Sequence, residues 1–364
     1  VSPAIVDDGF VIWRGEERNK DILSDIYTSE GLCYSFNIID PKELQVDPET
    51  YRSVPSTSHT KSKRWSLEEG YLNEDRADDF PRRTFLSGIS GGLIIDVYAN
   101  SSHMDHVCSD ANEGFQVNIH HPTESPNMDA SFRLPFDQIV SVAIKPKMIT
   151  VSEDLKHYNP EYRKCYFSNE RKLTYFNSYS QENCLDECLT NYTIQKCGCI
   201  PFYMPRSRSF PICGPASLIC IEISQSNFLL NDANNTMINC NCLPSCTSLQ
   251  YEVEISQSDW AWRESFAVLK NLMGDKYSEA FSNIEKSRLS RLIVYFKEMQ
   301  FLALERHELY GKTEFFSNTG GLLGLFIGFS ITSAIEILYF LTLRIICNIK
   351  RFGRGLWSGQ GGIG

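Results

Sequence analysis

The sequence lacks the short motifs with which many enzymes bind phosphate or metal. It contains neither a P-loop, G-x-x-x-x-G-K-[ST], nor an H-E-x-x-H zinc motif. Its 13 cysteines include no C-x-x-C pair of the kind that holds structural zinc. Positive charge is also scarce, because 35 Lys and Arg stand against 45 Asp and Glu, a formal net charge of −10. We therefore expect no enzyme, no metal or cofactor site and no nucleic-acid partner.

Long apolar runs are absent except for one near the C-terminus. Residues 315–335 are 21 positions without a charge, and apolar character resumes over 337–343 after the single Glu336. Because about 20 residues cross a bilayer, we expect at least one membrane span. A basic cluster follows it, and the positive-inside rule places such a cluster in the cytoplasm: Arg344, Lys350, Arg351 and Arg354. The long region before the span is therefore expected outside the cell.

Cysteine usage agrees with this orientation. Twelve of the 13 cysteines precede the apolar run and only Cys347 follows it, as in a disulfide framework in an oxidising compartment. Metal binding is the alternative, since "CGC" and "CNC" each place two thiols two positions apart. Three glycosylation sequons on the same side favour the extracellular reading: Asn100, Asn191 and Asn234.

The chain begins "VSPAIVDDGF", with no Met, no basic n-region and no apolar h-region. An extracellular region needs a signal peptide or an earlier membrane helix for delivery. We therefore expect that a preceding part of the protein is missing from this sequence.

Local patterns predict a β-rich first half. Strands are expected within 31–40, 92–100, 113–126 and 137–155, with a polar excursion over 53–82. The histidines at 103, 106, 120 and 121 suggest a metal site or pH sensor, but surface-loop histidines are the simpler expectation.

The second half opens with a cysteine-rich block over 165–246. Cys184 and Cys188 are four apart, so on a helix they share one face and can be joined to "CNCLPSC". A helix is predicted over about 259–274, with Ser258 or Asp259 as its N-cap. Residues 291–309 are predicted to form one strand that leads into the membrane helix.

The apolar run itself carries an unusual face. Gly320, Gly324 and Gly328 recur every four residues, as in a GxxxG helix dimer. Several hydroxyl and amide side chains accompany them, and Glu336 would cost about 2.5 kcal/mol or more in lipid unless it faces protein or water. Such a face suits a cation pathway. One helix cannot enclose a pore, so an oligomer follows from this hypothesis.

Four stretches carry a resemblance to a known family. "GLCYSFN", "CGCIPF", "CNCLPSC" and above all "EFFSNTGGLLGLFIGFSITSAIEI" resemble the degenerin/epithelial sodium channel family, and its insect pickpocket branch in particular. The resemblance covers essentially the whole chain. It implies an α+β fold, with a large disulfide-rich extracellular domain of palm, finger, thumb, knuckle and β-ball followed by one transmembrane helix. The first of the family's two transmembrane helices would be absent.

The resemblance also implies domain boundaries. The extracellular domain would occupy 1–310, with a β-rich palm, β-ball and finger over about 1–160. The cysteine-rich thumb would follow over about 161–250, and a knuckle helix and last palm strand over about 251–310. The second transmembrane helix with the pore would span 311–346, and a cytoplasmic tail 347–364.

The function implied is that of a subunit of a trimeric, voltage-insensitive, amiloride-sensitive sodium channel in the plasma membrane, multi-pass when complete. It would assemble as a homo- or heterotrimer and open to a mechanical, chemical or osmotic stimulus in sensory or epithelial cells. Na⁺ would be the permeant ion, and no cofactor is implied. The alternative is a non-conducting regulatory or ligand-binding subunit whose glycine face only packs.

Site residues follow from the same resemblance. The family's G-x-S selectivity filter matches Gly328, Phe329 and Ser330. The gate and pore lining match Ser317, Asn318, Gly321 and Leu325, and bulky side chains at the Ser317 position hold degenerins open. An inner-mouth carboxylate ring matches Glu336.

The cysteine order implies a nested ladder of five disulfides. The implied pairs are Cys165–Cys246, Cys184–Cys242, Cys188–Cys240, Cys197–Cys220 and Cys199–Cys213. The partners of Cys33 and Cys108 stay open at this point.

Overall fold

The computed structural model describes residues 11–47, 65–71, 79–100, 112–207, 209–232, 240–273, 287–328 and 330–353. The chain divides into two compact units, Val1–Arg306 and His307–Gly364. Cys108, Asn234 and Phe329 lie outside the described residues. Each unit is described in turn.

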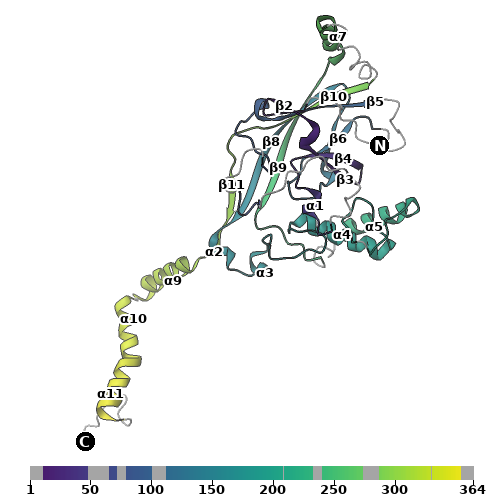
Figure 1. Ribbon diagram of the computed structural model, residues 1–364. Helices are drawn as coiled ribbons and strands as arrows, with labels where there is room; N and C mark the ends of the chain where they lie inside the picture. Colours follow the sequence, from purple (N-terminus) through teal and green to yellow (C-terminus); the bar gives the residue numbers. More distant parts are fainter. Residues whose placement is uncertain are drawn as a thin grey trace. The chain divides into compact units, whose positions relative to one another are not determined.

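A seven-stranded mixed sheet forms the centre of the first unit (Figure 1). Neighbouring strands are hydrogen-bonded in the order β11 (Ala303–Arg306), β8 (Gln138–Val151), β10 (Ser287–Phe296), β5 (Leu93–Asn100), β1 (Val11–Trp13) and β2 (Glu16–Arg18). The seventh strand, β9 (Ser248–Asp259), also pairs with β8.

The 14-residue strand β8 organises this sheet. It pairs antiparallel with β9 from Gln138↔Asp259 to Ile149↔Ser248, and parallel with both β10 and β11. Val140 and Val142 are fully buried on one face of β8, as the two-residue period of a strand requires. The sequence prediction of a strand within 137–155 is confirmed.

The single strand predicted over 291–309 is wrong in its bounds. The strand β10 begins at Ser287 and ends at Phe296, and β11 resumes only at Ala303. Both lie against β8, where the six residues 297–302 stand opposite the three residues 145–147. Three extra residues therefore leave the ladder, as in an enlarged β-bulge. The physical reason is tertiary: β10 and β11 pair with β8 in registers offset by three residues, and the side chains from Lys297 to Leu302 are all exposed, so no core contact holds them in the ladder.

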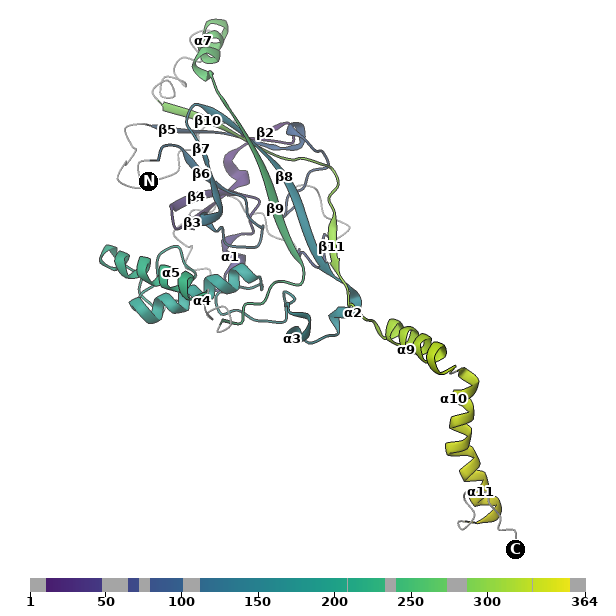
Figure 2. The same ribbon diagram turned by 180° about the vertical axis from the view of Figure 1, so that it is seen from behind.

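Two hairpins pack against the sheet, and the opposite views of Figure 1 and Figure 2 both show them beside it. One consists of β3 (Leu23–Thr28) and β4 (Gly31–Phe36), the other of β6 (Phe115–Asn118) and β7 (Ser131–Leu134). Leu23 joins a core cluster with Val11 and Trp13 of β1. Phe115 and Val117 pack against a cluster that includes Val140 and Leu292. Residues 31–40, 92–100 and 113–126 thus each contribute the predicted strand.

The cysteine-rich region is built on two helices, α4 (Gln181–Cys197) and α5 (Leu218–Asp232). Ser180 caps α4 by accepting a hydrogen bond from the Asn183 N–H at 3.1 Å. Cys184 and Cys188 share one face of α4, as predicted, and are bonded to Cys242 and Cys240. Three further disulfides complete the set: Cys165–Cys246, Cys197–Cys220 and Cys199–Cys213.

These are the same five pairs that the resemblance implies. All thiols of "CGC" and "CNC" take part in them, which excludes the alternative of thiolate metal ligands there. The described free cysteines are Cys33 and Cys347.

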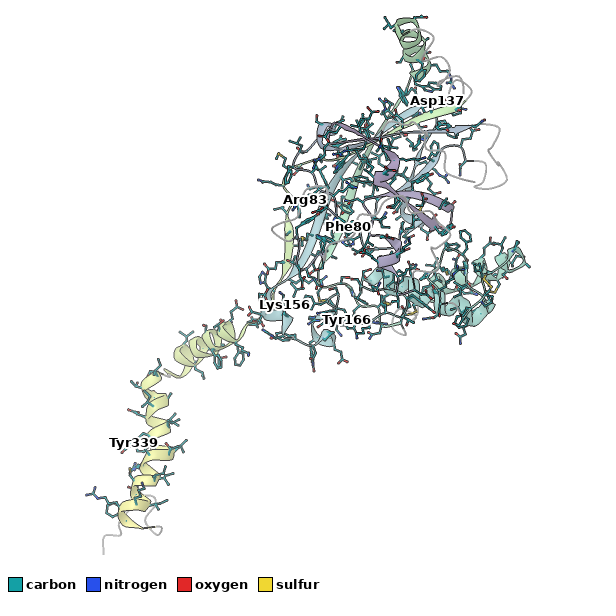
Figure 3. All side chains as sticks on the ribbon, in the orientation of Figure 1. Phe80, Arg83, Asp137, Lys156, Tyr166 and Tyr339 are labelled. Carbon is teal, nitrogen blue, oxygen red and sulfur yellow. A yellow bond between two sulfur atoms is a disulfide. The ribbon has the colours of Figure 1, made fainter. Side chains whose placement is uncertain are left out.

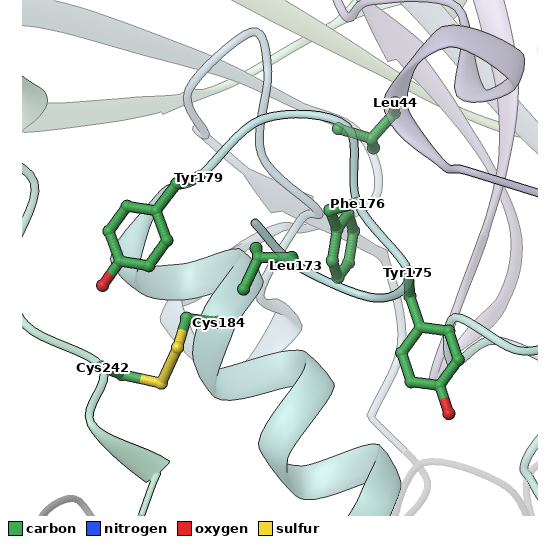
Figure 4. Close-up of a cluster of buried hydrophobic side chains, with 7 residues drawn as sticks. All are labelled: Leu44, Leu173, Tyr175, Phe176, Tyr179, Cys184 and Cys242. Atoms are coloured by element: carbon green, nitrogen blue, oxygen red, sulfur yellow. A yellow bond between two sulfur atoms is a disulfide. The ribbon is translucent and has the colours of Figure 1, made fainter. Parts of the chain in front are cut away.

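An apolar cluster anchors the start of α4 (Figure 4). The Cys184–Cys242 bond lies beside Tyr179, whose hydroxyl donates to the Leu243 carbonyl, and Phe176 packs near Leu44. Leu44 ends α1 (Pro41–Leu44). The short helices α2 (Glu153–Lys156) and α3 (Pro160–Arg163) connect β8 to this region, and four 3₁₀ turns occur among the described residues: Lys20–Ile22, Ile89–Gly91, Met128–Ala130 and Pro215–Ser217.

The predicted helix after β9 exists as α7 (Trp262–Met273), but its predicted cap is wrong. Ser258 and Asp259 belong to β9 instead, because their backbones pair with β8. Asp137, labelled in Figure 3, holds the start of α7. Its carboxylate accepts from the Trp262 indole at 2.8 Å and from Arg288 at 2.6 Å. Burial acts to raise the pKa of Asp137, but these hydrogen bonds together with the charges of Arg288 and Arg263 outweigh it and lower that pKa.

The second unit is helical. It contains α9 (Lys312–Ile327), α10 (Ile331–Leu338), a π-helical turn (Tyr339–Leu343) and α11 (Arg344–Phe352). The last three segments form a 22-residue helical stretch, Ile331–Phe352, long and apolar enough to cross a membrane. The single helix predicted over 311–346 is therefore two helices, because α9 ends at Ile327 and α10 begins at Ile331.

Candidate functional site

The membrane segment breaks at Gly328. This residue adopts the left-handed conformation, with φ +66°, and its N–H donates to the Gly324 carbonyl at 3.1 Å. Glycine is the residue that adopts this conformation without steric cost, so it ends α9 as a helix C-cap. The four-residue glycine repeat thus reaches the break, but Gly328 is not part of the helical face that the sequence predicts.

Ser330 starts the next helix. Its hydroxyl accepts from the Ser333 N–H, and its carbonyl accepts from the Ala334 N–H at 3.1 Å. Serine is a preferred N-cap residue because its short side chain replaces the missing backbone acceptor. In the G-x-S motif, Gly328 therefore ends one helix and Ser330, two residues later, begins the next.

A helix break has a chemical consequence in a membrane. After the Gly324 carbonyl, which the Gly328 N–H caps, the final carbonyls of a helix have no intrahelical partner by the geometry of any helix end. Non-helical backbone is tolerated at membrane depth where it is buried in protein or lines a water-filled cavity. Carbonyl oxygens at such a place can replace the hydration shell of a cation.

One face of α9 carries the predicted gate residues. At about 100° per residue, Ser317, Asn318, Gly321 and Leu325 fall within an arc of about 100°. All four are exposed within this chain, and Leu325 keeps 79% of its surface. The helix thus brings these four positions together on one side.

Glu336 lies on α10 with polar neighbours. Thr332 is one turn before it and Ser333 three residues before it, so the three side chains share one face of α10. All three lie after Ser330, whose hydroxyl is also 2.5 Å from that of Thr332. A stripe of hydroxyls thus leads from the helix break to the carboxylate.

The stretch Ile331–Phe352 ends in basic residues. Lys350 and Arg351 occupy the last turn of α11, and the Arg344 guanidinium lies 4.9 Å from the Phe340 ring. Arg354 lies outside the described residues.

The first unit carries a half-buried acidic pair at α4, formed by Asp186 of the helix and Glu124. Burial raises the pKa of Glu124 to about 7, with the Glu182 charge adding to the shift. Burial also raises the pKa of Asp186 to about 7, again helped by Glu182. Both groups therefore change charge near neutral pH.

The expectation of surface-loop histidines is wrong for 120 and 121. His121 is buried, and burial lowers its pKa to about 4. His120 bonds the Ser35 hydroxyl and the His121 carbonyl, both at 2.9 Å. Ser35 of β4 contacts His120, and the Trp65 ring lies 6.1 Å from that of His121, so segments distant in sequence contact both rings, which no local pattern could indicate. His103 and His106 lie outside the described residues.

Two of the three sequons can be located. Asn191 is exposed on α4 and accepts from the Tyr175 hydroxyl at 3.2 Å. Asn100 is exposed at the end of β5. Surface positions of this kind are compatible with glycosylation.

Sequence reasoning overlooked a G-x-S-x-G pattern at 88–92, whose letters also occur in hydrolase nucleophile elbows. Here Ser90 lies in the 3₁₀ turn Ile89–Gly91, which leads into the strand β5. A nucleophile elbow needs a strand followed by a helix, so the context is wrong. Gly92 has a packing reason instead, because a Cβ there would lie 2.5 Å from the Val294 carbonyl oxygen.

Sequence comparison assigns the chain to a family. The profile described as amiloride-sensitive sodium channel matches residues 10–340. The chain belongs to the amiloride-sensitive sodium channel family. It is a pickpocket-like member of a family of ion channels, and it is not an enzyme.

Similar proteins include Pickpocket protein 28 of Drosophila melanogaster, 32% identical over 340 residues, which cover 91% of this chain and 55% of that protein. Pickpocket protein 11 of the same species is 31% identical over 254 residues, 68% of this chain and 46% of that protein. Degenerin del-1 of Caenorhabditis elegans is 25% identical over 275 residues, 73% of this chain and 39% of that protein. The chain spans about half the length of the curated relatives it matches.

Proposed function

We propose that this chain is part of a subunit of a sodium-selective, voltage-insensitive, amiloride-sensitive cation channel in the plasma membrane. Its disulfide-rich unit faces the outside, and the chain after Phe352 lies in the cytoplasm. The observation that carries the proposal is the helix break at Gly328 and Ser330, which presents carbonyl and hydroxyl oxygens within an otherwise apolar segment.

In this proposal Gly328, Phe329 and Ser330 form the selectivity filter. Na⁺ would exchange part of its hydration shell for oxygens of this segment. Ser317, Asn318, Gly321 and Leu325 line the pore and its gate, because they share one face of α9. Glu336 gives a carboxylate ring at the inner mouth, where it concentrates cations.

Assembly follows from geometry. A single chain provides one broken helix, so the pore requires symmetric repetition, and we propose a homo- or heterotrimer with related subunits. Each Glu336 would then face water or protein rather than lipid, which removes most of its cost.

In this proposal a stimulus reaches the gate through the polypeptide chain that joins the sheet to α9. The strand β11 ends at Arg306 and α9 begins at Lys312, so a movement of the sheet pulls on the pore helix through five residues. The five disulfides would limit internal deformation of the cysteine-rich region, so that a force on this region moves it as one stiff body.

The test is a current recording on the complete protein that contains this chain. The protein is expressed alone and with related subunits in a cell without endogenous current of this type, under mechanical, chemical and osmotic stimuli. We expect an inward Na⁺ current that amiloride blocks and that depends little on voltage. Normal surface expression without Na⁺ current in any combination would contradict the proposal and favour a non-conducting regulatory subunit.

A further inference from the structure

The helix α11, at the C-terminal end of the second unit, carries positive charge without a negative partner (Figure 1). Arg344, Lys350 and Arg351 are all exposed, and no carboxylate pairs with them among the residues that the structure describes. The sequence contains no Asp or Glu after Glu336, which precedes Arg344 by eight residues, or about 12 Å of helix. In a chain with a formal net charge of −10, this end is locally cationic and attracts an anionic partner.

Two of these cations share one face of α11. Arg344 and Arg351 are seven residues apart, so at about 100° per residue they lie within about 20° of each other around the helix axis. The apolar residues of α11 lie on the other side of the helix: Ile345, Ile346, Ile349 and Phe352. A helix with a basic face and an apolar face is typical of a segment that lies at a membrane interface.

The helix α11 begins where the apolar run ends. Residues 315–343 contain a single charged residue, Glu336, and they are more than the roughly 20 residues that cross a bilayer. Arg344 is therefore expected at the depth of the lipid headgroups. Its guanidinium lies 4.9 Å from the Phe340 ring, one turn closer to the apolar run. This contact keeps the apolar stem of Arg344 against the helix while the charge reaches the polar layer.

Two simpler explanations cover only part of this pattern. The helix dipole favours cations in the last turn of a helix, which accounts for Lys350 and Arg351. It does not account for Arg344, because the effect falls off within that turn. The positive-inside rule concerns the orientation that a segment takes during insertion. It predicts no preference of the finished protein for one lipid over another, so a binding measurement separates it from a lipid site.

We propose that α11 is a binding site for anionic phospholipids of the cytoplasmic leaflet. Arg344, Lys350 and Arg351 donate hydrogen bonds to headgroup phosphate oxygens, for which the forked guanidinium group is well suited. The isoleucine side of α11 contacts the acyl chains. The inference rests on the proposed orientation, because the negative surface potential of a cell membrane belongs to its cytoplasmic leaflet.

Lipid retention measured by native mass spectrometry tests the site. The complete protein that contains this chain is purified in detergent and incubated with equal amounts of phosphatidylserine, phosphatidylglycerol and phosphatidylcholine that carry the same acyl chains. The lipids that stay bound after the protein leaves the micelle are then counted. A micelle has no sides, so the result does not depend on orientation. No current is recorded, so this inference and the channel proposal fail separately.

We expect both anionic lipids to be retained about tenfold better than phosphatidylcholine. This factor lies between the effects of one and of two basic residues near an anionic surface. Retention of either anionic lipid that is no better than that of phosphatidylcholine would overturn the proposal.

Two variants of α11 separate charge from side-chain shape. The triple variant Arg344→Gln, Lys350→Gln and Arg351→Gln should reduce the preference to about twofold or less, in a protein that elutes as the wild type does. An undiminished preference would overturn the location. Arg344→Lys combined with Arg351→Lys conserves the charge and should keep a preference of about fivefold or more. A loss as large as that of the triple variant would contradict recognition by charge.

The matched control removes the same number of positive charges from the first unit. Lys145→Gln, Lys147→Gln and Lys297→Gln are suitable because each lysine is about half exposed and pairs with a glutamate. This variant should retain the anionic lipids as the wild type does. A loss equal to that of the triple variant of α11 would show that net charge acts rather than a site on this helix.

Discussion

Ser330 Oγ lies 3.3 Å from the backbone nitrogen of Ser333, so the residue at the helix break is also the N-cap of α10. The same hydroxyl cannot be removed without affecting both the helix start and the oxygens available to a cation. Its replacement is therefore the most direct test of the filter assignment.

Ser330→Ala should lower the Na⁺/K⁺ permeability ratio of the assembled channel. Losing a differential stabilisation of about 1 kcal/mol changes this ratio by a factor of about 5. Reversal potentials under bi-ionic conditions measure it. Thr342→Ala is the matched control, because the Thr342 hydroxyl donates to the Leu338 carbonyl and takes no part in the cap, so this variant should retain near-native selectivity. Equal shifts in both variants would argue against a filter at Ser330.

Ser317→Val should produce constitutive Na⁺ current. Ser317 and Gly321 share the side of α9 that we propose faces the pore, and a bulkier side chain there would hinder closure of the helices. Whole-cell current without stimulus is the measurement, normalised to surface expression. Thr319→Val is the control, since residue 319 lies about 200° around the helix from residue 317. A silent Ser317→Val channel at normal surface density would contradict the assigned position.

Acidification from pH 8 to pH 5 should stabilise the region around α4. The pKa values of Glu124 and Asp186 are raised to about 7 by burial, above their unfolded values. In the window between about pH 4 and pH 7 the folded state therefore binds more protons, and the free energy of unfolding falls as pH rises. The thermal midpoint across this range measures the effect. The double variant Glu124→Gln and Asp186→Asn should flatten the profile, whereas an unchanged slope would show that other groups carry it.

Asp96→Ala should destabilise the first unit strongly. The Asp96 carboxylate is buried on β5 and accepts two hydrogen bonds from Arg291 of β10, at 2.6 and 2.7 Å. Arg291 also lies 4.5 Å over the Trp260 ring. Because Arg291 is partly exposed, we expect a loss of roughly 2–4 kcal/mol, below the upper range for buried pairs. Chemical unfolding followed by tryptophan fluorescence measures it.

Glu252→Ala provides the comparison for Asp96→Ala. Glu252 pairs with Lys147 across two neighbouring strands, and both side chains are at least half exposed. Exposed pairs contribute about 0–1 kcal/mol. Similar losses in the two variants would contradict a special role for the Asp96–Arg291 pair.

Much of the secondary structure follows from local patterns. Alternating apolar residues indicated β4, β5 and β8, and the four-residue spacing of Cys184 and Cys188 indicated the face of α4. The strand β9 was missed although Leu249, Tyr251, Val253 and Ile255 alternate in it. The helix α5 was missed as well, although apolar residues are frequent in it.

The errors have a common physical cause. His121 is buried by segments far away in sequence, and the bulge at 297–302 depends on the register of two strands against β8. Ser258 and Asp259 are good N-cap residues by composition, but twelve pairs with β8 hold them in a strand. In each case long-range contacts outweigh a local preference of about 1 kcal/mol.

Amino-acid order alone was enough for the existence of an apolar segment near the C-terminus, the distribution of the cysteines on one side of it and the position of the G-x-S letters, because hydropathy and residue order are local properties. Folding in three dimensions decided that Gly328 ends one helix and Ser330 begins another. It also buried the Trp13 N–H and the Asn118 oxygen without a partner among the described residues. Those features depend on which distant side chains reach a given atom, and only packing determines that.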